Sequence, residues 1–342
     1  MLLGLARHLP SIRELHVLAS GDALAQSCKD APRLVGAVPR LPGPLGIKCG
    51  RRRLARVGDL VLGGGSILHS SNSIEWKLRM VREARRRGRR TFALGVSLGP
   101  FPDAAAPRRC AELLALLDAV MVRDERSEAL ALELCPTARV ALAPDLSLAI
   151  SDLARPGREP PVGRRLGVAL TTTGMESAEV MRLLEALGDG IPKLLAEHDL
   201  AGVDLLSFCS DPRFGDHAVH ERLAALLPGC DVRHRPYRGD AVGLLEAVAG
   251  CALFVGMRLH SQLFAAMASV PLVAVSYHPK NEAVLSVLHS DMVHAPARTL
   301  DSGVLLERAR EPFVLPESRI AAAATRLRTV VAEALAVGGP GA

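Results

Sequence analysis

Residues 252–280 read ALFVGMRLHSQLFAAMASVPLVAVSYHPK, in which an apolar strand, a helix of small residues and a second apolar strand follow one another. Unbroken apolar strands separated by helices are typical of a parallel sheet that helices cover on both faces. Arg258 and His260 stand where the first strand gives way to the helix. This stretch therefore predicts an α/β fold with a polar junction at the end of a strand.

The same alternation extends along the chain in two blocks. In the first block, strands are predicted at 15–19, 33–38, 59–64, 90–96, 119–123 and 138–142, and helices at 74–87, 107–117 and 125–134. In the second block, strands are predicted at 166–170, 203–208, 231–235, 252–256 and 271–277, and helices at 176–197, 217–227, 240–248, 262–268 and 318–335. The stretch SDLARPGREPPVGRR between the blocks has three prolines and no periodicity. We therefore predict an N-terminal α/β domain at 1–150, a linker at 151–165, a C-terminal α/β domain at 166–316, and a terminal helix with a flexible tail at 317–342.

The bulk composition limits the class of protein. The 342 residues are 49% hydrophobic, enough for two cores, but no run approaches the ~18–20 apolar residues of a membrane span. The opening MLLGLARHLPSIREL becomes charged too soon for a secretory signal, so a cytoplasmic protein is expected. The net charge of +6 suits anionic partners, but with 3% aromatic residues little is present on which bases could stack, and no nucleic-acid partner is expected. The seven scattered cysteines form neither a CxxC nor a Cys/His cluster, which predicts reduced thiols and no metal site.

Polar residues follow several strands of the first domain, at the sheet edge where α/β proteins bind ligands. Gly63, Gly64 and Gly65, with Ser66 and His69, predict a ligand-facing loop, although a tight turn also explains part of this pattern. Two further candidates are Ser97, which an ordinary Gly-Pro turn follows, and Asp145, for which an Asx turn is the rival explanation. Arg123 and Asp124 are expected to be structural, with Asp124 capping the helix that begins near Glu125.

The second domain offers the strongest junction. If the segment after residue 256 is extended, Arg258 and His260 point the same way, and Ser261 then caps a helix at 262–268. A guanidinium, an imidazole and a helix start together favour a phosphate or carboxylate. Lys280, at the end of the next strand, either joins this anion site or is a solvated lysine.

These stretches resemble a known family. GDLVLGGGSIL, ALGVSLGPF, VRDERS, APDLSL and VGMRLHSQLFAAMASVPLVAVSYHPK are similar to the successive motifs of the polysaccharide pyruvyl transferases, in the same order and over about residues 55–285. The resemblance implies two Rossmann-like domains with mostly parallel sheets, which face one another across a cleft as in GT-B glycosyltransferases. It also implies transfer of a pyruvyl group from phosphoenolpyruvate to a sugar hydroxyl pair of a cell-surface polysaccharide or its lipid-linked precursor, which yields a ketal and phosphate.

The resemblance assigns Arg258 and His260 to the phosphoenolpyruvate site. Because ketal formation moves protons near neutral pH, we hypothesise that His260 is the acid/base group and that Asp145 or His69 assists across the cleft. Phosphoenolpyruvate is then the donor substrate and no cofactor is expected. A lipid-linked acceptor would bring the protein to the inner face of the membrane.

Two features depart from the family pattern. The family begins with a strand and a Gly-Asn-x-Gly-Asp type loop, whereas this sequence opens on MLLGLARHLP, so we expect the N-terminal domain to lack its first strand. The family also places an arginine just after the first strand of the second domain, where this sequence has Thr171, Thr172 and Thr173.

Two other functions stay open. The first is a GT-B glycosyltransferase with a nucleotide-sugar donor, which would commonly use an acidic residue for the ribose; Glu282 and Asp291 are nearby but in no recognisable pattern. The second is a non-catalytic sugar-binding protein of a polysaccharide assembly cluster, which the two departures favour.

Overall fold

A computed structural model describes residues 15–19, 34–39, 58–154, 164–211, 215–288 and 293–337, with side chains except in the first two ranges and at residues 279–280. The chain divides into two compact units, which we call unit 1 (residues 1–150 and 322–342) and unit 2 (residues 151–321). Most of the predicted linker (155–163), the tail from 338, the opening MLLGLARHLP, and Cys28, Cys49 and Asp291 lie outside the described residues.

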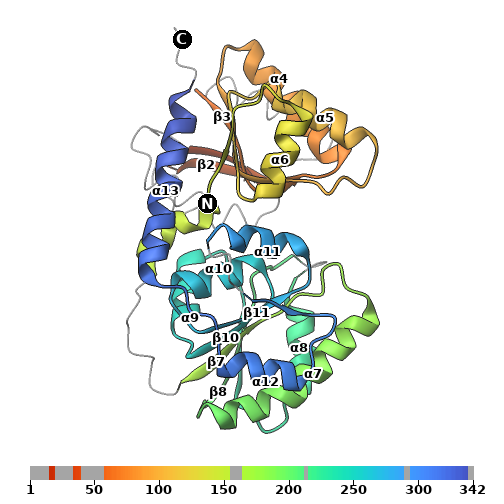
Figure 1. Cartoon of the computed structure of the whole chain (residues 1–342), viewed down its shortest axis with the longest axis vertical. Helices are drawn as coiled ribbons and strands as arrows, with labels where there is room; N and C mark the ends of the chain where they lie inside the picture. The colour runs from red at the N-terminus through yellow and green to blue at the C-terminus, as the bar shows by residue number, and fades with distance from the viewer. Residues whose placement is uncertain are drawn as a thin grey trace. The chain divides into compact units, whose positions relative to one another are not determined.

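Unit 1 is built on a parallel sheet whose strands follow one another in chain order (Figure 1). Its strands are β3 (Leu60–Leu68), β4 (Thr91–Leu98), β5 (Ala119–Val122) and β6 (Val140–Leu142), and its helices are α4 (Ser71–Arg86), α5 (Ala105–Leu114) and α6 (Glu125–Leu134). Every residue of β4 is buried, and the apolar faces of the three helices pack on the sheet to form the core. Two further strands, β1 (Leu15–Ala19) and β2 (Leu34–Pro39), pair in parallel as a separate small sheet.

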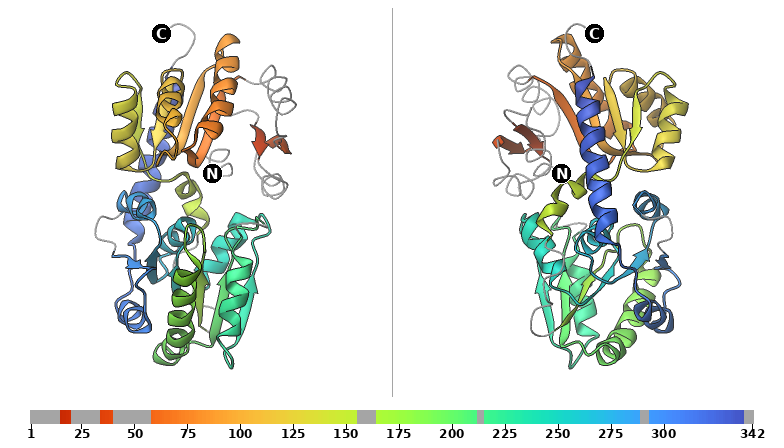
Figure 2. Two further views of the ribbon diagram at one scale, coloured as in Figure 1. Left: turned by 90° about the vertical axis from the view of Figure 1, so that its right-hand side faces the viewer. Right: turned by 60° about the vertical axis from the view of Figure 1, so that its left-hand side comes forward.

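Unit 2 contains a parallel six-stranded sheet in the order β12-β11-β10-β7-β8-β9. Its strands are β7 (Arg165–Ala169), β8 (Gly202–Leu206), β9 (Val232–Arg235), β10 (Leu253–Gly256), β11 (Leu272–Ser276) and β12 (Ala295–Pro296). Its helices are α7 (Ser177–Glu197), α8 (His217–Ala225), α9 (Ala241–Ala249), α10 (Leu259–Met267), α11 (Pro279–Ser286) and α12 (Ser302–Arg310). Helices α7, α8 and α12 cover one face of the sheet, with α7 beside α8, and α9 and α10 cover the other (Figures 1 and 2).

The strand order of unit 2 fixes where a ligand can bind. Numbered from β7, the order is 3-2-1-4-5-6, which is that of a dinucleotide-binding Rossmann domain. The connections that leave β7 and β10 run to opposite faces of the sheet, so a crevice opens between the carboxyl ends of these neighbouring strands. The segment after β10 begins Met257-Arg258, and the segment after β7 begins Leu170-Thr171.

Each predicted strand and helix has a counterpart within a few residues, and the prediction of mostly parallel α/β sheets is confirmed. The mutual facing of the two domains across a cleft stays a prediction. The sequence patterns did not predict the 3-10 helix at Leu146–Leu153 or the helices α11 and α12. The last helix, α13 (Glu317–Ala336), begins in unit 2 and ends in unit 1.

Two local predictions were wrong. The glycines at 63–65 lie within β3, which continues to Leu68, and not in a loop; Gly65 adopts φ +97° at an irregularity in the pairing with β4. Helix α10 begins at Leu259, so Arg258 is its N-cap residue and Ser261 lies in its first turn. His260 is therefore helical, and it does not share an extended segment with Arg258 as predicted.

Candidate functional site at the strand ends

Arg258 is placed by the turn that joins β10 to α10. Its backbone is extended (φ −75°, ψ 141°), and its carbonyl oxygen accepts a hydrogen bond from the Ser261 hydroxyl at 2.7 Å. Gly256 lets the helix approach the strand, since a Cβ there would lie 3.1 Å from both Gln262 Cγ and Ser261 Oγ. The sequence thus packs the first turn of α10 tightly onto the end of β10.

A buried carboxylate holds the Arg258 side chain. Nε of Arg258 donates to Oδ1 of Asp216 at 2.5 Å, and Asp216 is completely buried. The other oxygen of Asp216 accepts hydrogen bonds from the backbone amides of Phe208 (2.7 Å) and Cys209 (2.9 Å). Burial raises the pKa of the Asp216 carboxyl, while Arg258 and the two amides oppose that rise. Asp216, which lies between β8 and α8, therefore fixes the direction of the guanidinium.

Asp216 is a site residue that no sequence motif predicts. It lies 42 residues before Arg258, and no local pattern links the two. The one available signal was its place directly before the helix that begins at His217, where an aspartate reads as a cap; in the structure its side chain makes no capping hydrogen bond and turns to Arg258.

His220 completes the buried polar layer beneath this junction. Its Nε2 accepts the backbone amide of Leu170 at 3.2 Å, and its Nδ1 lies 3.3 Å from the Ser207 hydroxyl. Burial lowers the pKa of His220 to about 3, so the imidazole is neutral and acts as an acceptor that ties α8 to the end of β7. Thr171, on that same strand end, is 1% exposed, and its hydroxyl pairs with that of Thr173.

The start of α10 suits an anion. The Arg258 side chain makes no capping hydrogen bond to the helix, so the first amides keep their partial positive charge. His260 is exposed in the first turn, and Ser261 and Gln262 are buried. Two carbonyls, those of Gly256 and Val275, accept from Gln262 Nε2 at 2.8 and 3.0 Å, which locks α10 between β10 and β11. A cation, helix amides and an exposed imidazole thus meet at the switch point of the sheet.

Unit 1 gathers its own polar cluster at the carboxyl ends of its strands, and Arg123 is at its centre. Arg123 donates to Asp145 (2.6 Å), to the Ser97 hydroxyl (2.9 Å) and to the Ser66 hydroxyl (3.3 Å). Ser97 donates in turn to Asp124 at 2.6 Å, and Asp124 caps α6 by accepting the Ser127 amide, as the sequence predicted. Asp145 also accepts the amide of Ser147 at 2.9 Å.

Comparison with known proteins bears on what these clusters do. A sequence model of the family described as polysaccharide pyruvyl transferase matches residues 26–279. The chain belongs to this family. A search of curated protein sequences found no match. The family assigns the chain to the transferases, and it implies a sugar or glycan acceptor.

Several solved structures have a fold similar to that of this chain. A putative UDP-N-acetylglucosamine 2-epimerase from Listeria monocytogenes aligns with a TM-score of 0.63 and 10% identity, over 98% of this chain and 90% of that one. UDP-GlcNAc 2-epimerases from Methanocaldococcus jannaschii (TM-score 0.62, 11% identity, 94% and 99% coverage) and from Neisseria meningitidis, bound to UDP-GlcNAc (0.61, 11%, 98% and 95%), are similarly related. At this identity the likeness shows the fold alone, and it confirms the predicted GT-B class of this pyruvyl transferase family member.

The structure brings the predicted site residues together in two groups. In unit 2, Arg258, His260 and Ser261 share the first turn of α10, while the Lys280 side chain lies outside the described residues. In unit 1, Ser66, Ser97 and Asp145 meet through Arg123. His69 is exposed, with its Nδ1 3.0 Å from the Ser66 carbonyl oxygen, and Gly63 and Gly64 lie half-buried in β3. The site roles of these residues in the family member stay predictions.

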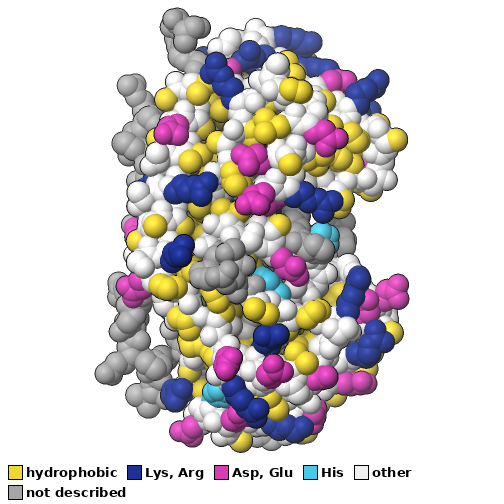
Figure 3. Space-filling model, viewed as in Figure 1, with side chains coloured by type: hydrophobic (Ala, Val, Ile, Leu, Met, Phe, Trp, Pro, Cys, Tyr) yellow, Lys and Arg dark blue, Asp and Glu magenta, His cyan; other side chains and the backbone are white. Residues whose placement is uncertain are grey.

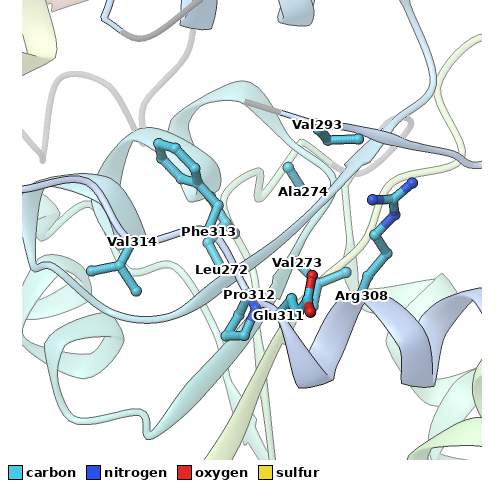
Figure 4. Close-up of a pocket in the computed structure, with 9 residues that line it drawn as sticks. All are labelled: Leu272, Val273, Ala274, Val293, Arg308, Glu311, Pro312, Phe313 and Val314. Carbon is cyan, nitrogen blue, oxygen red and sulfur yellow. The ribbon is translucent and has the colours of Figure 1, made fainter. Parts of the chain in front are cut away.

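A pocket of about 310 Å³ in unit 2 is lined by none of these residues (Figure 4). Its lining residues are Leu272, Val273, Ala274, Val293, Arg308, Glu311, Pro312, Phe313 and Val314. Because it takes in the first residues of β11, it lies toward the amino end of the sheet, whereas Arg258 follows the carboxyl end of β10. It therefore contributes nothing to the site at the switch point.

Basic side chains are interspersed with acidic ones on the face shown in Figure 3. In the arginine run at the end of α4, Arg85 pairs with Asp118 at 2.7 Å and Arg87 with Glu83 at 2.9 Å, so these cations are used within unit 1. Within the described ranges, no helix has both the length and the hydrophobicity needed to cross a bilayer.

Proposed function

We propose that this pyruvyl transferase family member uses phosphoenolpyruvate as its donor and forms a ketal on a hydroxyl pair of a sugar, in a cell-surface polysaccharide or its lipid-linked precursor. The observation that carries the proposal is the junction of β10 and α10, where Arg258 and an uncapped helix start lie beside exposed His260. Phosphoenolpyruvate carries a phosphate and a carboxylate, and both are anions that a guanidinium and helix amides bind well.

Arg258 is the donor-binding residue in this proposal, and Asp216 positions it. A guanidinium held by a fixed carboxylate loses less side-chain freedom when the donor binds, and this pre-organisation favours affinity. The helix start adds further positive potential without a mobile side chain. The three threonines at 171–173, at the end of β7, would supply hydroxyl groups instead of the arginine expected there.

His260 is the acid/base group in this proposal. The methylene carbon of phosphoenolpyruvate gains a proton, the two sugar oxygens bond to its C2 carbon, and the bond from C2 to the phosphate oxygen breaks. Of the two hydroxyl protons, one balances the new methyl group and the other leaves with phosphate. An imidazole can deliver or accept such a proton near neutral pH, and His260 is exposed at the helix start where the anion would bind.

Asp145 has a supporting role in the proposal. It is 5% exposed and is held by Arg123 and the Ser147 amide, so proton transfer would require it to leave an ion pair. Its contribution is more simply the orientation of Arg123 and, through it, of the hydroxyls of Ser66 and Ser97. A lipid-linked acceptor would place this reaction at the inner face of the membrane.

The test combines donor binding with turnover. Phosphoenolpyruvate should raise the melting temperature of the full chain, whereas UDP-sugars should not; stabilisation by UDP-sugars alone would instead indicate a nucleotide-sugar transferase. With an accepted glycan, phosphate release should fall about 10²- to 10⁴-fold in His260→Ala. Wild-type phosphate release by that variant would contradict the role of His260, and an unshifted melting temperature with every donor would contradict the proposed function.

A further inference from the structure

Three side chains that can ligate a metal converge on the surface of unit 2, apart from the residues of the proposed site. His217 Nδ1 lies 3.7 Å from Glu221 Oε1, and His234 Nε2 lies 3.5 Å from the same oxygen. The three ligand atoms all lie within 4.8 Å of one another. Two imidazoles and a carboxylate are a ligand set that zinc uses in proteins.

The fold brings these residues together from two elements. His217 and Glu221 are four residues apart on α8, which places them on the same face of that helix. His234 lies on the edge strand β9, where Val232, two residues earlier, packs against the core beneath α8. Since residues two apart on a strand share a face, His234 is directed to the side of the sheet that α8 covers. The neighbouring Arg235 pairs on the other face, with Asp204 at 3.0 Å.

The spacing of the ligand atoms fits a small tetrahedral site. With zinc bonds of about 2.0–2.1 Å, two ligand atoms of a tetrahedron lie about 3.4 Å apart. The two distances to Glu221 Oε1 are close to that value, and the remaining gap between the imidazoles closes with small side-chain rotations. The rings are already in contact edge to face, with centroids 6.2 Å apart. No large rearrangement of α8 or β9 is needed.

The fourth position of such a site would be taken by water. His220, the next imidazole on α8, has both ring nitrogens engaged, with the Leu170 amide and the Ser207 hydroxyl. The side chains of His217, Glu221 and His234 are 77%, 55% and 34% exposed, so water can reach an ion held by them.

We propose that His217, Glu221 and His234 bind a divalent transition-metal ion, with Zn²⁺ as the physiological candidate. The imidazole ligands select such ions over Mg²⁺ and Ca²⁺, which prefer oxygen. A bound ion cross-links α8 to the exposed edge strand β9. The proposal does not rest on the proposed transferase activity, since none of the three ligands is a residue of the donor site, although His217 directly follows Asp216, which positions Arg258. No sequence motif predicts the site, because its third ligand follows 13 residues after the second on a different element.

The test is titration of Zn²⁺ into the full chain after removal of any affinity tag, followed by calorimetry. We expect one ion per chain, and an affinity at least about 10- to 100-fold lower in Glu221→Gln or His234→Gln, since even outer residues of metal sites contribute this much. Glu185→Gln removes an exposed carboxylate from the neighbouring helix α7 and should bind as wild type does.

Two further readouts report on the geometry. Co²⁺ in place of Zn²⁺ should give the intense visible absorption of a tetrahedral site, and Zn²⁺ should raise the melting temperature of the wild type but not of the variants. Circular dichroism in EDTA checks that the variants fold. The proposal is overturned if Zn²⁺ does not bind, if the variants bind it as well as the wild type does, or if Mg²⁺ binds equally tightly.

Discussion

Both units place an arginine and a buried aspartate at the carboxyl end of a parallel sheet, but the two pairs differ in what surrounds them. The Arg123 side chain in unit 1 is 4% exposed, and its hydrogen bonds go to Asp145, Ser97 and Ser66. The Arg258 side chain in unit 2 is 18% exposed and stands at an uncapped helix start. Arg123 and Asp145 therefore belong to an internal hydrogen-bond network, whereas the Arg258 guanidinium is partly accessible to solvent. The same two residue types therefore support packing in one unit and, by our proposal, ligand binding in the other.

The largest expected effect is the loss of stability when Asp145 or Asp216 is replaced by asparagine. Asp145→Asn should lower the free energy of unfolding by about 3–5 kcal/mol, because it leaves Arg123 as a buried cation without its charged partner. Asp216→Asn should cost less, about 1–3 kcal/mol, because the more exposed Arg258 can regain water. Urea denaturation measures both.

A matched control is Asp189→Asn, which breaks the exposed pair with Lys193 and should leave the unfolding midpoint almost unchanged. If Asp145→Asn lowers the free energy of unfolding no more than Asp216→Asn does, the contrast between the buried Arg123 pair and the more exposed Arg258 pair is wrong.

Replacing one glycine in each unit by alanine tests how closely the backbone is packed there. Gly95 adopts φ +65°, and a Cβ there would lie 2.6 Å from Leu146 Cγ, so Gly95→Ala should cost about 2–4 kcal/mol through strain and overpacking. Gly256→Ala has no such backbone strain and meets Gln262 and Ser261 at 3.1 Å, so it should cost about 1 kcal/mol. The second change should nevertheless weaken phosphoenolpyruvate binding, since it displaces the first turn of α10. Melting curves with and without the donor separate the two effects, and equal losses of stability would contradict the expectation.

The Arg258 guanidinium should affect donor binding as well as stability, because it is also the charged partner of buried Asp216. Arg258→Ala should weaken phosphoenolpyruvate binding by about 1.5–3 kcal/mol, or roughly 10- to 100-fold in Kd, as a charge-assisted contact is lost. Arg310→Ala is the matched control, because Arg310 pairs with Glu197 on the surface at the far end of α7 and should not affect the donor. Calorimetric titration measures the Kd of phosphoenolpyruvate. An unchanged Kd in Arg258→Ala would mean that the helix start alone binds the donor and would contradict the role of Arg258.

The smallest expected difference concerns the reactivity of the cysteine thiols in the two units. Burial raises the pKa of Cys110 in unit 1 and of Cys251 in unit 2 to about 12, so neither should react with iodoacetamide at pH 8 in the folded protein. Among the cysteines that the structure describes, the half-buried Cys209 and Cys230 should be labelled first. Peptide mapping after a time course would show early labelling of Cys110 or Cys251 if one unit opens locally before the other.

The sequence by itself determined the α/β alternation, the positions of the strands, the Asp124 cap and the presence of both Arg258 and His260 at one strand-to-helix junction. These features are local, because periodicity and capping depend on residues within a turn or a strand of one another. Even there, the start of α10 was misplaced, since the turn at Arg258 is set by the close packing of Gly256 against Gln262.

The tertiary structure alone decided which polar groups meet. Asp216 reaches Arg258 across 42 residues, Arg123 reaches Asp145 across 22, and His234 joins His217 and Glu221 from another element. The strand order 3-2-1-4-5-6, which places Arg258 beside the end of β7, likewise depends on pairing between distant strands. Such contacts leave no periodic trace in the chain, because each is fixed by the packing of whole helices and strands and not by the residues next to it in sequence.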